Sequence, residues 1–262
     1  MASLSRDGIA LAFDKIDGPG QPVVLIHGWC CDRTYFAPQV DYFVGQGHTV
    51  LAPDLRGHGG SDAPDGPYTM QVLADDVAWL CDALGIGDAI VVGHSMGGIV
   101  AFDLAVRYPG LVASVVMIDA AVTRPDASRA GLPAFIETLK GPDRVPAIQD
   151  YVSRVLFQPT DDPDRKARIL EAMTRTAPHV AYEAVQGMYD WDASEATGKP
   201  LPPALFIANA GKPLSDLPRL AALVPGLMMG QVVGSGHFCT LEVPDQVNAM
   251  LGRFATIVAG RT

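Results

Sequence analysis

Asp88-Ala-Ile-Val-Val-Gly-His-Ser-Met-Gly-Gly98 is the stretch of sequence that decides the fold. Its apolar part, residues 89–92, has the length and the β-branched content of a buried parallel strand. The residues that follow the serine repeat apolar side chains at helical spacing. The chain must therefore turn sharply at Ser95, between a strand and a helix. Such a turn brings the backbone so close that Gly93 and Gly97 have a steric reason to be glycine.

Ser95 is the candidate nucleophile of this turn. The strained backbone points its hydroxyl into open space, and the following helix aims its free amides and the positive end of its dipole at that space. Such surroundings suit a developing oxyanion. A Gly-x-Ser-x-Gly pattern also occurs by chance, in loops where the serine only caps a helix. The rest of the chain has to decide between the two interpretations.

Composition excludes several classes of function. The chain has 262 residues, is 48% hydrophobic and carries a formal net charge of −10, which fits one α/β domain with an inserted subdomain. The chain is acidic and has no clusters of Lys and Arg, which argues against binding to nucleic acid or to an anionic membrane surface. No apolar run is long enough to cross a bilayer, and the first residues lack the apolar core of a secretory signal. These features predict a cytoplasmic protein, either a monomer or a homo-oligomer.

The four cysteines match neither a metal site nor a disulfide framework. Cys30 and Cys31 are adjacent, whereas Cys81 and Cys239 stand alone, and neither zinc ligands nor paired bridges have this spacing. We therefore expect reduced thiols. No metal and no organic cofactor is implied by the sequence.

Strand-like and helical segments alternate through most of the chain. Strands are expected at residues 9–15, 23–26, 49–52, 89–92, 114–118, 205–208 and 227–233, and helices at about 33–46, 69–84, 96–108 and 245–258. This alternation predicts an α/β fold with a mainly parallel sheet flanked by helices. Residues 123–202 show helical patches divided by prolines and no buried strand, which predicts a helical cap between the two parts of the core, 1–122 and 203–262.

Four motifs resemble, in order and spacing, the landmarks of the α/β-hydrolase fold. They are Val23-Val-Leu-Ile-His-Gly-Trp29, Asp54-Leu-Arg-Gly-His-Gly59, Gly93-His-Ser-Met-Gly97 and Gly234-Ser-Gly-His-Phe238. The resemblance covers essentially the whole chain outside the cap, and four motifs in register are far more specific than one. It implies that the cap follows the sixth strand of that fold. It also implies the backbone amides of Trp29 and Met96 as the donors of an oxyanion hole.

His237 is the best candidate for the base that activates Ser95. A serine hydroxyl titrates far above neutral pH, so it needs an adjacent base. His237 follows the last expected strand in a loop of small residues that can fold over the sheet, and the resemblance places the histidine of the α/β hydrolases here. His27 and His58 are expected to brace loops, and His94 to form packing or a pocket wall.

The acid of the triad departs from the common pattern. Most relatives carry an Asp in the loop that here reads Asn209-Ala-Gly-Lys-Pro-Leu-Ser-Asp216, and Lys212 occupies the expected position. A cation cannot orient the imidazole or stabilise the imidazolium. Some branches of the fold place the acid one strand earlier, where Asp119 ends an expected strand. We therefore expect Asp119 to be the triad acid, with Asp216 as the alternative.

The residues that bind substrate are less well marked by motifs. Positions beside the motif residues and aromatic side chains in the expected cap are the candidates for lining a pocket. These are Trp29, Cys30, Val122, Tyr151, Phe157, Trp191 and Phe238. Cys30 is not a candidate nucleophile, because no base motif accompanies it.

The motifs predict a serine hydrolase that cleaves a carboxylic ester, a lactone or a similar acyl bond of a small apolar molecule. Ser95 attacks, His237 carries the proton and Asp119 orients His237. Hydrolysis of a carbon–carbon bond in a β-diketone-like substrate is an alternative. Another is a cofactor-independent dioxygenase of the same fold with a His and acid dyad, which His27-Gly-Trp-Cys-Cys-Asp32 and Asp119 resemble. A protein that only binds a ligand would usually have lost the serine or the histidine.

Overall fold

A computed structural model describes residues 1–260, apart from the side chains of residues 195 and 196. Its centre is an 8-stranded sheet with the strand order β1-β2-β4-β3-β5-β6-β7-β8. The strands are β1 (Ala2–Arg6), β2 (Ile9–Ile16), β3 (Gly20–Ile26), β4 (His48–Pro53), β5 (Ala89–His94), β6 (Val112–Ile118), β7 (Ala204–Ala208) and β8 (Met228–Gln231). Only β1 and β2 pair in antiparallel fashion with their neighbours among the described strands. The mainly parallel sheet is as expected, and β1 is an additional strand.

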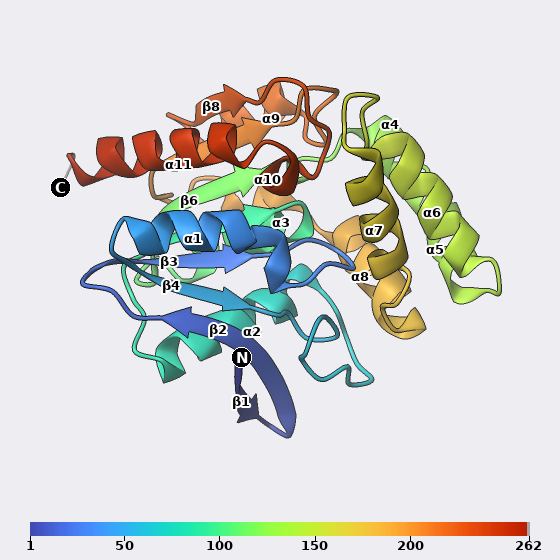
Figure 1. Ribbon diagram of the computed structural model, residues 1–262, viewed down its shortest axis with the longest axis horizontal. Helices are drawn as coiled ribbons and strands as arrows, with labels where there is room; N and C mark the ends of the chain where they lie inside the picture. Colours follow the sequence, from blue (N-terminus) through green and yellow to red (C-terminus); the bar gives the residue numbers. More distant parts are fainter. Residues whose placement is uncertain (261–262) are drawn as a thin grey trace.

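Helices cover both faces of the sheet (Figure 1). The 3₁₀ turn η1 (Arg33–Phe36), α1 (Ala37–Gly45) and α11 (Pro244–Ala259) pack on one face, and α2 (Met70–Ala83) and α3 (Met96–Arg107) pack on the other. The short helices α9 (Leu217–Leu223) and α10 (Cys239–Glu242) complete the core.

Strand β5 supplies side chains to both hydrophobic cores. Ile90 and Val92 pack on the side of α1 and α11, and Val91 packs on the side of α2 and α3. Successive side chains of a strand point to opposite faces. A strand that is buried on both faces therefore reads as a continuous apolar run, as β5 does.

The chain between β6 and β7 is helical. It forms α4 (Asp126–Arg129), α5 (Leu132–Lys140), α6 (Arg144–Val155), α7 (Pro163–Met173), α8 (Pro178–Asp190) and the 3₁₀ turn η2 (Ala193–Ala196). Pro163 and Pro178 are the first residues of their helices, where proline's missing N–H would have had no acceptor within the helix.

Figure 1 shows α5, α6 and α7 beyond the ends of the sheet toward which the arrows of β3, β4 and β6 point. Ligands of open α/β sheets bind outside these carboxyl ends. The helices between β6 and β7 therefore lie over the edge where a site is expected. Within residues 1–260, no helix combines the length and the apolar character needed to cross a membrane.

Candidate active site

Ser95 lies between β5 and α3 in a backbone conformation that residues with side chains rarely adopt. Its φ is 57° and its ψ is −121°, and its amide donates a hydrogen bond to the carbonyl of Ile118 at 2.9 Å. A Cβ atom at Gly93 would overlap the carbonyl oxygen of Gly97, and one at Gly97 would overlap that of Ile26. The close approach of backbone that the sequence implied is therefore present on both sides of the serine.

His237 and Asp119 form a buried hydrogen-bonded pair. His237 Nδ1 lies 2.7 Å from Asp119 Oδ2, and the two side chains are 3% and 0% exposed. Asp119 follows β6 with a φ of 42°, and its amide donates to the carbonyl of Ile207 in β7 at 2.8 Å. Among the described residues, no hydrogen bond is made to His237 Nε2. That nitrogen is free to accept a proton.

Asn209 is a further partner of the Asp119 carboxylate that the sequence pattern did not mark as functional. Its Nδ2 donates to Asp119 Oδ2 at 2.5 Å, and its Oδ1 accepts from the amide of Gly211 at 2.6 Å. Asn209 is the first residue after β7, and Ile118 pairs with Ile207 in the sheet. This register, which a sequence does not state, is what brings the amide of Asn209 to Asp119.

The other candidate acid, Asp216, is a helix cap. Its carboxylate accepts from the amide of Arg219 at 3.1 Å, at the start of α9, and its own amide donates to the carbonyl of Thr123 at 2.7 Å. Lys212 is exposed. Of the two candidate carboxylates, the structure brings Asp119 to His237.

The two amides expected to bind an oxyanion lie close to the serine turn. Met96 is the first residue of α3, Trp29 follows Gly28 in the loop after β3, and both residues are buried. A Cβ atom at Gly28 would lie 3.0 Å from the Cβ atom of Ser95. Neither the Trp29 amide nor the Met96 amide donates to an acceptor within the described part of the chain. Buried amides are nearly always paired, so two unpaired ones beside a serine suit an anion.

His94, the residue before Ser95, positions the loop of the candidate base. Its ring centroid lies 4.5 Å from that of His237, and its Nε2 lies 2.8 Å from the backbone carbonyl of His237. Burial lowers the pKa of His94 well below its usual range. A neutral ring with its proton on Nε2 therefore donates to that carbonyl and holds the two histidines side by side.

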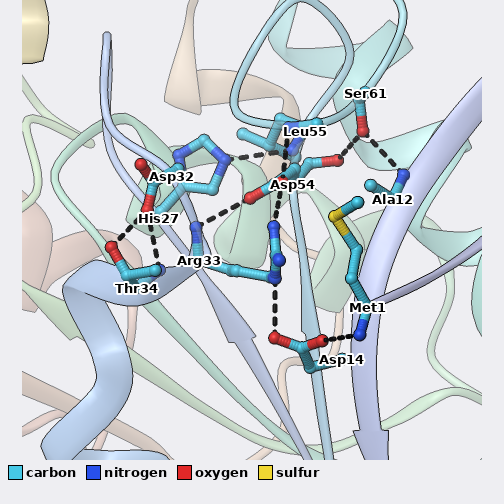
Figure 2. Close-up of polar contacts among 11 residues, drawn as sticks. Met1, Ala12, Asp14, His27, Asp32, Arg33, Thr34, Asp54, Leu55 and Ser61 are labelled. Atoms are coloured by element: carbon cyan, nitrogen blue, oxygen red, sulfur yellow. Dashed lines mark hydrogen bonds and ion pairs between the residues drawn. The ribbon is translucent and has the colours of Figure 1, made fainter.

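His27 braces the loop that carries Trp29. Its Nε2 accepts from the amide of Leu55 at 3.0 Å, and its Nδ1 donates to the carbonyl of Gly28 at 2.8 Å. Figure 2 shows the His27 ring directed toward Leu55. Both ring nitrogens are used by the backbone, so the role is structural, as the sequence pattern suggested.

Arg33 connects the same loop to two neighbouring segments (Figure 2). Its guanidinium donates to Asp54 Oδ2 at 2.5 Å and to Asp14 Oδ2 at 2.7 Å, and its amide donates to Asp54 Oδ1 at 2.8 Å. Asp54 opens the motif Asp54-Leu-Arg-Gly-His-Gly59 and is fully buried. This motif therefore fixes the loop that presents the Trp29 amide.

The buried His27 predicts a loss of stability in mild acid. Burial lowers the pKa of His27 from 6.5 to about 4. Between these two pH values His27 is therefore protonated in the unfolded chain and neutral in the folded chain. The stability that depends on neutral His27 is present above pH 6.5 and is lost as the pH falls from 6.5 to 4. We expect the free energy of unfolding to fall by up to about 1.4 kcal/mol per pH unit from this group.

Urea denaturation at pH 7.0, 6.0 and 5.0 measures this slope. The variant His27→Gln should be less stable at pH 7.0 but should lose stability less steeply with acid than the wild type. Equal slopes for the two proteins would contradict the assignment.

Ser95 lines a small cavity beneath the helices that join β6 to β7. Its volume is about 30 Å³, and Trp29 and Tyr151 line it as expected. The cavity is also lined by residues that the motifs did not indicate, among them Arg124 and Phe135. The Trp29 indole donates to the carbonyl of Ala181 in α8 at 2.9 Å, which ties the loop after β3 to these helices.

The remaining residues expected to bind substrate lie elsewhere and are not among the described residues that line the Ser95 cavity. Val122 and Trp191 line a neighbouring cavity, where the Trp191 indole donates to the Val122 carbonyl at 3.1 Å. The rings of Phe157 and Phe238 pack against each other with centroids 5.1 Å apart. Burial raises the pKa of the Cys30 thiol to about 12, which leaves it protonated.

Comparison with known proteins identifies the family. Residues 21–244 match the family model described as alpha/beta hydrolase fold. The chain belongs to the alpha/beta hydrolase fold family. The resemblance that the four motifs indicated is thereby confirmed, and so is the fold class.

Two curated proteins illustrate the relationship. The AB hydrolase superfamily protein YisY of Bacillus subtilis is 24% identical to this alpha/beta hydrolase and covers 91% of this chain and 92% of its own length. The 2-(acetamidomethylene)succinate hydrolase of Mesorhizobium japonicum is 29% identical, over 87% of this chain and 85% of that protein.

Solved structures of alpha/beta hydrolases match over nearly the whole chain. A thermophilic esterase from Thermogutta terrifontis has a TM-score of 0.85 and 26% identity, and the match covers 98% of this chain and 97% of the esterase. The enol-lactonase from Burkholderia xenovorans has a TM-score of 0.86 and 25% identity, over 97% and 100% of the two chains.

Proposed function

We propose that this alpha/beta hydrolase is a serine esterase or lactonase that acts on a small, largely apolar molecule through Ser95, His237 and Asp119. The observation that carries the proposal is the buried hydrogen bond of 2.7 Å between His237 Nδ1 and Asp119 Oδ2, whose histidine ring lies 4.5 Å from that of His94, the residue before the strained Ser95. A carboxylate at Nδ1 keeps the imidazole in the tautomer whose Nε2 can accept the serine proton, and stabilises the imidazolium that results.

The reaction then proceeds in two steps. Ser95 Oγ attacks the carbonyl carbon while His237 Nε2 takes the hydroxyl proton, and the carbonyl oxygen accepts hydrogen bonds from the two unpaired amides of Trp29 and Met96. Collapse of this intermediate expels the alcohol, which leaves with the proton from His237. Water then attacks the acyl-enzyme by the same route, and the carboxylic acid leaves Ser95. With a lactone, alcohol and acid remain in one product.

Two of the structural relatives support this chemistry. An esterase and an enol-lactonase are among the structural relatives that match nearly the whole chain. The small cavity beside Ser95 is lined mainly by apolar side chains, which favours a small apolar acyl or alcohol group. We further propose that residues 123–202 act as a cap that closes over the bound substrate.

Labelling with a fluorophosphonate tests the proposal without knowledge of the substrate. Intact-mass analysis should find one adduct on the wild type and none on Ser95→Ala, and turnover of short-chain esters and lactones should be lost in the same variant. Ser128→Ala changes a serine in α4 and should still be labelled.

An adduct that persists on Ser95→Ala would contradict the assignment of the nucleophile. Absence of both labelling and hydrolysis in the wild type would contradict the serine hydrolase. In that case oxygen uptake with a hydroxyquinolone would test the dioxygenase alternative.

A further inference from the structure

Arg124 is a guanidinium without a protein partner at the candidate site. It lies between β6 and α4 and lines the cavity that contains Ser95. Its Nε is buried and has no hydrogen-bond partner, and the side chain forms no ion pair within the described part of the chain. The residue as a whole is partly exposed, but a buried nitrogen such as this Nε is almost always hydrogen-bonded. Arg124 is therefore in the state expected of a side chain whose partner is a ligand.

Arg124 is one of several described arginines that form no ion pair. The arginines with acid partners are Arg6, Arg33, Arg56, Arg107, Arg154, Arg165 and Arg175. The chain holds 29 acidic residues and 19 Lys and Arg, so carboxylates are in excess. What distinguishes Arg124 is its Nε, which is the one arginine atom among the described residues that is buried without a hydrogen-bond partner.

Arg124 lines three cavities, and two of them share further lining residues with each other. A larger cavity of about 520 Å³ lies among α4, α5 and α6, and Arg124 lines this cavity as well as the one beside Ser95. Phe135 and Tyr151 also line both cavities, and their rings stack with centroids 4.7 Å apart. A volume of 520 Å³ fits a small molecule, whereas the 30 Å³ beside Ser95 holds about one water. A substrate that enters through the larger cavity therefore meets Arg124 on its way to Ser95.

Arg124 is the sole charged residue among those described as lining the Ser95 cavity, whose other walls are mainly apolar. In such surroundings a guanidinium binds a carboxylate strongly, because its planar fork matches the two oxygens and little water competes. The net charge of −10 repels anions at long range. Selection of an anion must therefore come from a local cation such as Arg124.

We propose that the substrate is an ester or lactone that also carries a carboxylate, and that Arg124 binds this carboxylate while the acyl carbon reaches Ser95. This inference rests on the proposed serine hydrolase function. It makes Arg124 the residue that selects acidic esters over neutral esters of the same size.

Two esters that differ in charge and by one methyl group test the selectivity. Mono-p-nitrophenyl glutarate is an anion, and its methyl ester is neutral. We expect the wild type to have the higher kcat/KM for the anion. In Arg124→Gln the ratio of the two kcat/KM values should fall by about 10- to 100-fold, mainly through KM, as expected for the loss of a charge-assisted hydrogen bond. Arg124→Lys should retain part of the preference.

Arg219→Gln is the charge-matched control. Arg219 lines the neighbouring cavity with Arg124 but is not among the described residues that line the Ser95 cavity. Its substitution should leave the ratio unchanged. A wild type without preference for the anionic ester, or an Arg124→Gln variant that loses activity equally on both esters, would overturn the inference.

Binding to a variant that cannot react separates this inference from the hydrolase proposal. Calorimetry should find that Ser95→Ala binds monomethyl glutarate more tightly than dimethyl glutarate, and that adding Arg124→Gln removes the difference. This result would support the carboxylate site even if neither ester were hydrolysed by the wild type. Equal binding of the two compounds, or binding of neither, would overturn it.

Discussion

Replacing Asp119 with Asn is expected to lower kcat by about 10⁴-fold and to change KM only a few-fold. The carboxylate of Asp119 accepts from His237 Nδ1 and from Asn209 Nδ2 through the same oxygen. An amide carries no charge, so it cannot stabilise the imidazolium that forms when Ser95 is deprotonated. If its nitrogen turns toward His237, the ring must carry its proton on Nε2, and that tautomer cannot accept the serine proton.

The matched control is Asp216→Asn. Asp216 caps α9, and asparagine caps a helix as well as aspartate does. This variant should therefore keep both its activity and its stability. Turnover of a short-chain p-nitrophenyl ester and the rate of fluorophosphonate labelling at Ser95 measure the two effects. Full activity of Asp119→Asn together with loss of activity in Asp216→Asn would show that the assignment of Asp119 as the triad acid is wrong.

The sequence predicted those parts of the molecule that local backbone constraints determine. A serine between two glycines at a strand end allows little besides a sharp turn, and Ser95 has the strained backbone expected there, with a φ of 57°. The lysine at the expected acid position after β7, Lys212, pointed to the end of β6, and Asp119 and His237 do meet in the structure. In both cases a motif and its place relative to the strands carry the information.

Features that depend on tertiary neighbours could not be predicted in the same way. Phe238 follows His237 in the chain, but its ring packs on Phe157 rather than on the Ser95 cavity, since neighbouring side chains point in different directions. A sequence equally cannot show that Arg124 forms no ion pair with a described carboxylate, because any acid could have folded beside it.

Strand β1 was missed for a different physical reason. All of its residues except Leu4 are exposed, so no alternation of apolar and polar residues marks it as a strand. It is held by pairing with β2 through a tight turn at Asp7 and Gly8, both with positive φ. An edge strand of this kind contributes backbone hydrogen bonds and little to the core.

Replacing Gly97 with Ala is expected to lower the free energy of unfolding by more than about 4 kcal/mol, a large part of the total stability of a typical domain. The added Cβ atom would overlap the backbone carbonyl oxygens of Ile26 and His27. These atoms belong to the last residue of β3 and the residue after it, and β3 pairs with β5 directly before the serine turn. Relief of the overlap would therefore have to separate the two strands, whereas a side chain in the core could have moved aside.

Gly45→Ala is the control for this effect. Gly45 ends α1, and a Cβ atom there would meet nothing within 4 Å. The substitution should raise stability by about 0.5–1 kcal/mol, since alanine favours the helix over glycine. Urea denaturation and the yield of soluble protein measure both variants. If Gly97→Ala were as stable as the wild type, the backbone around Ser95 would have to be less closely packed than the structure indicates. The steric explanation of the Gly-x-Ser-x-Gly pattern in this chain would then be wrong.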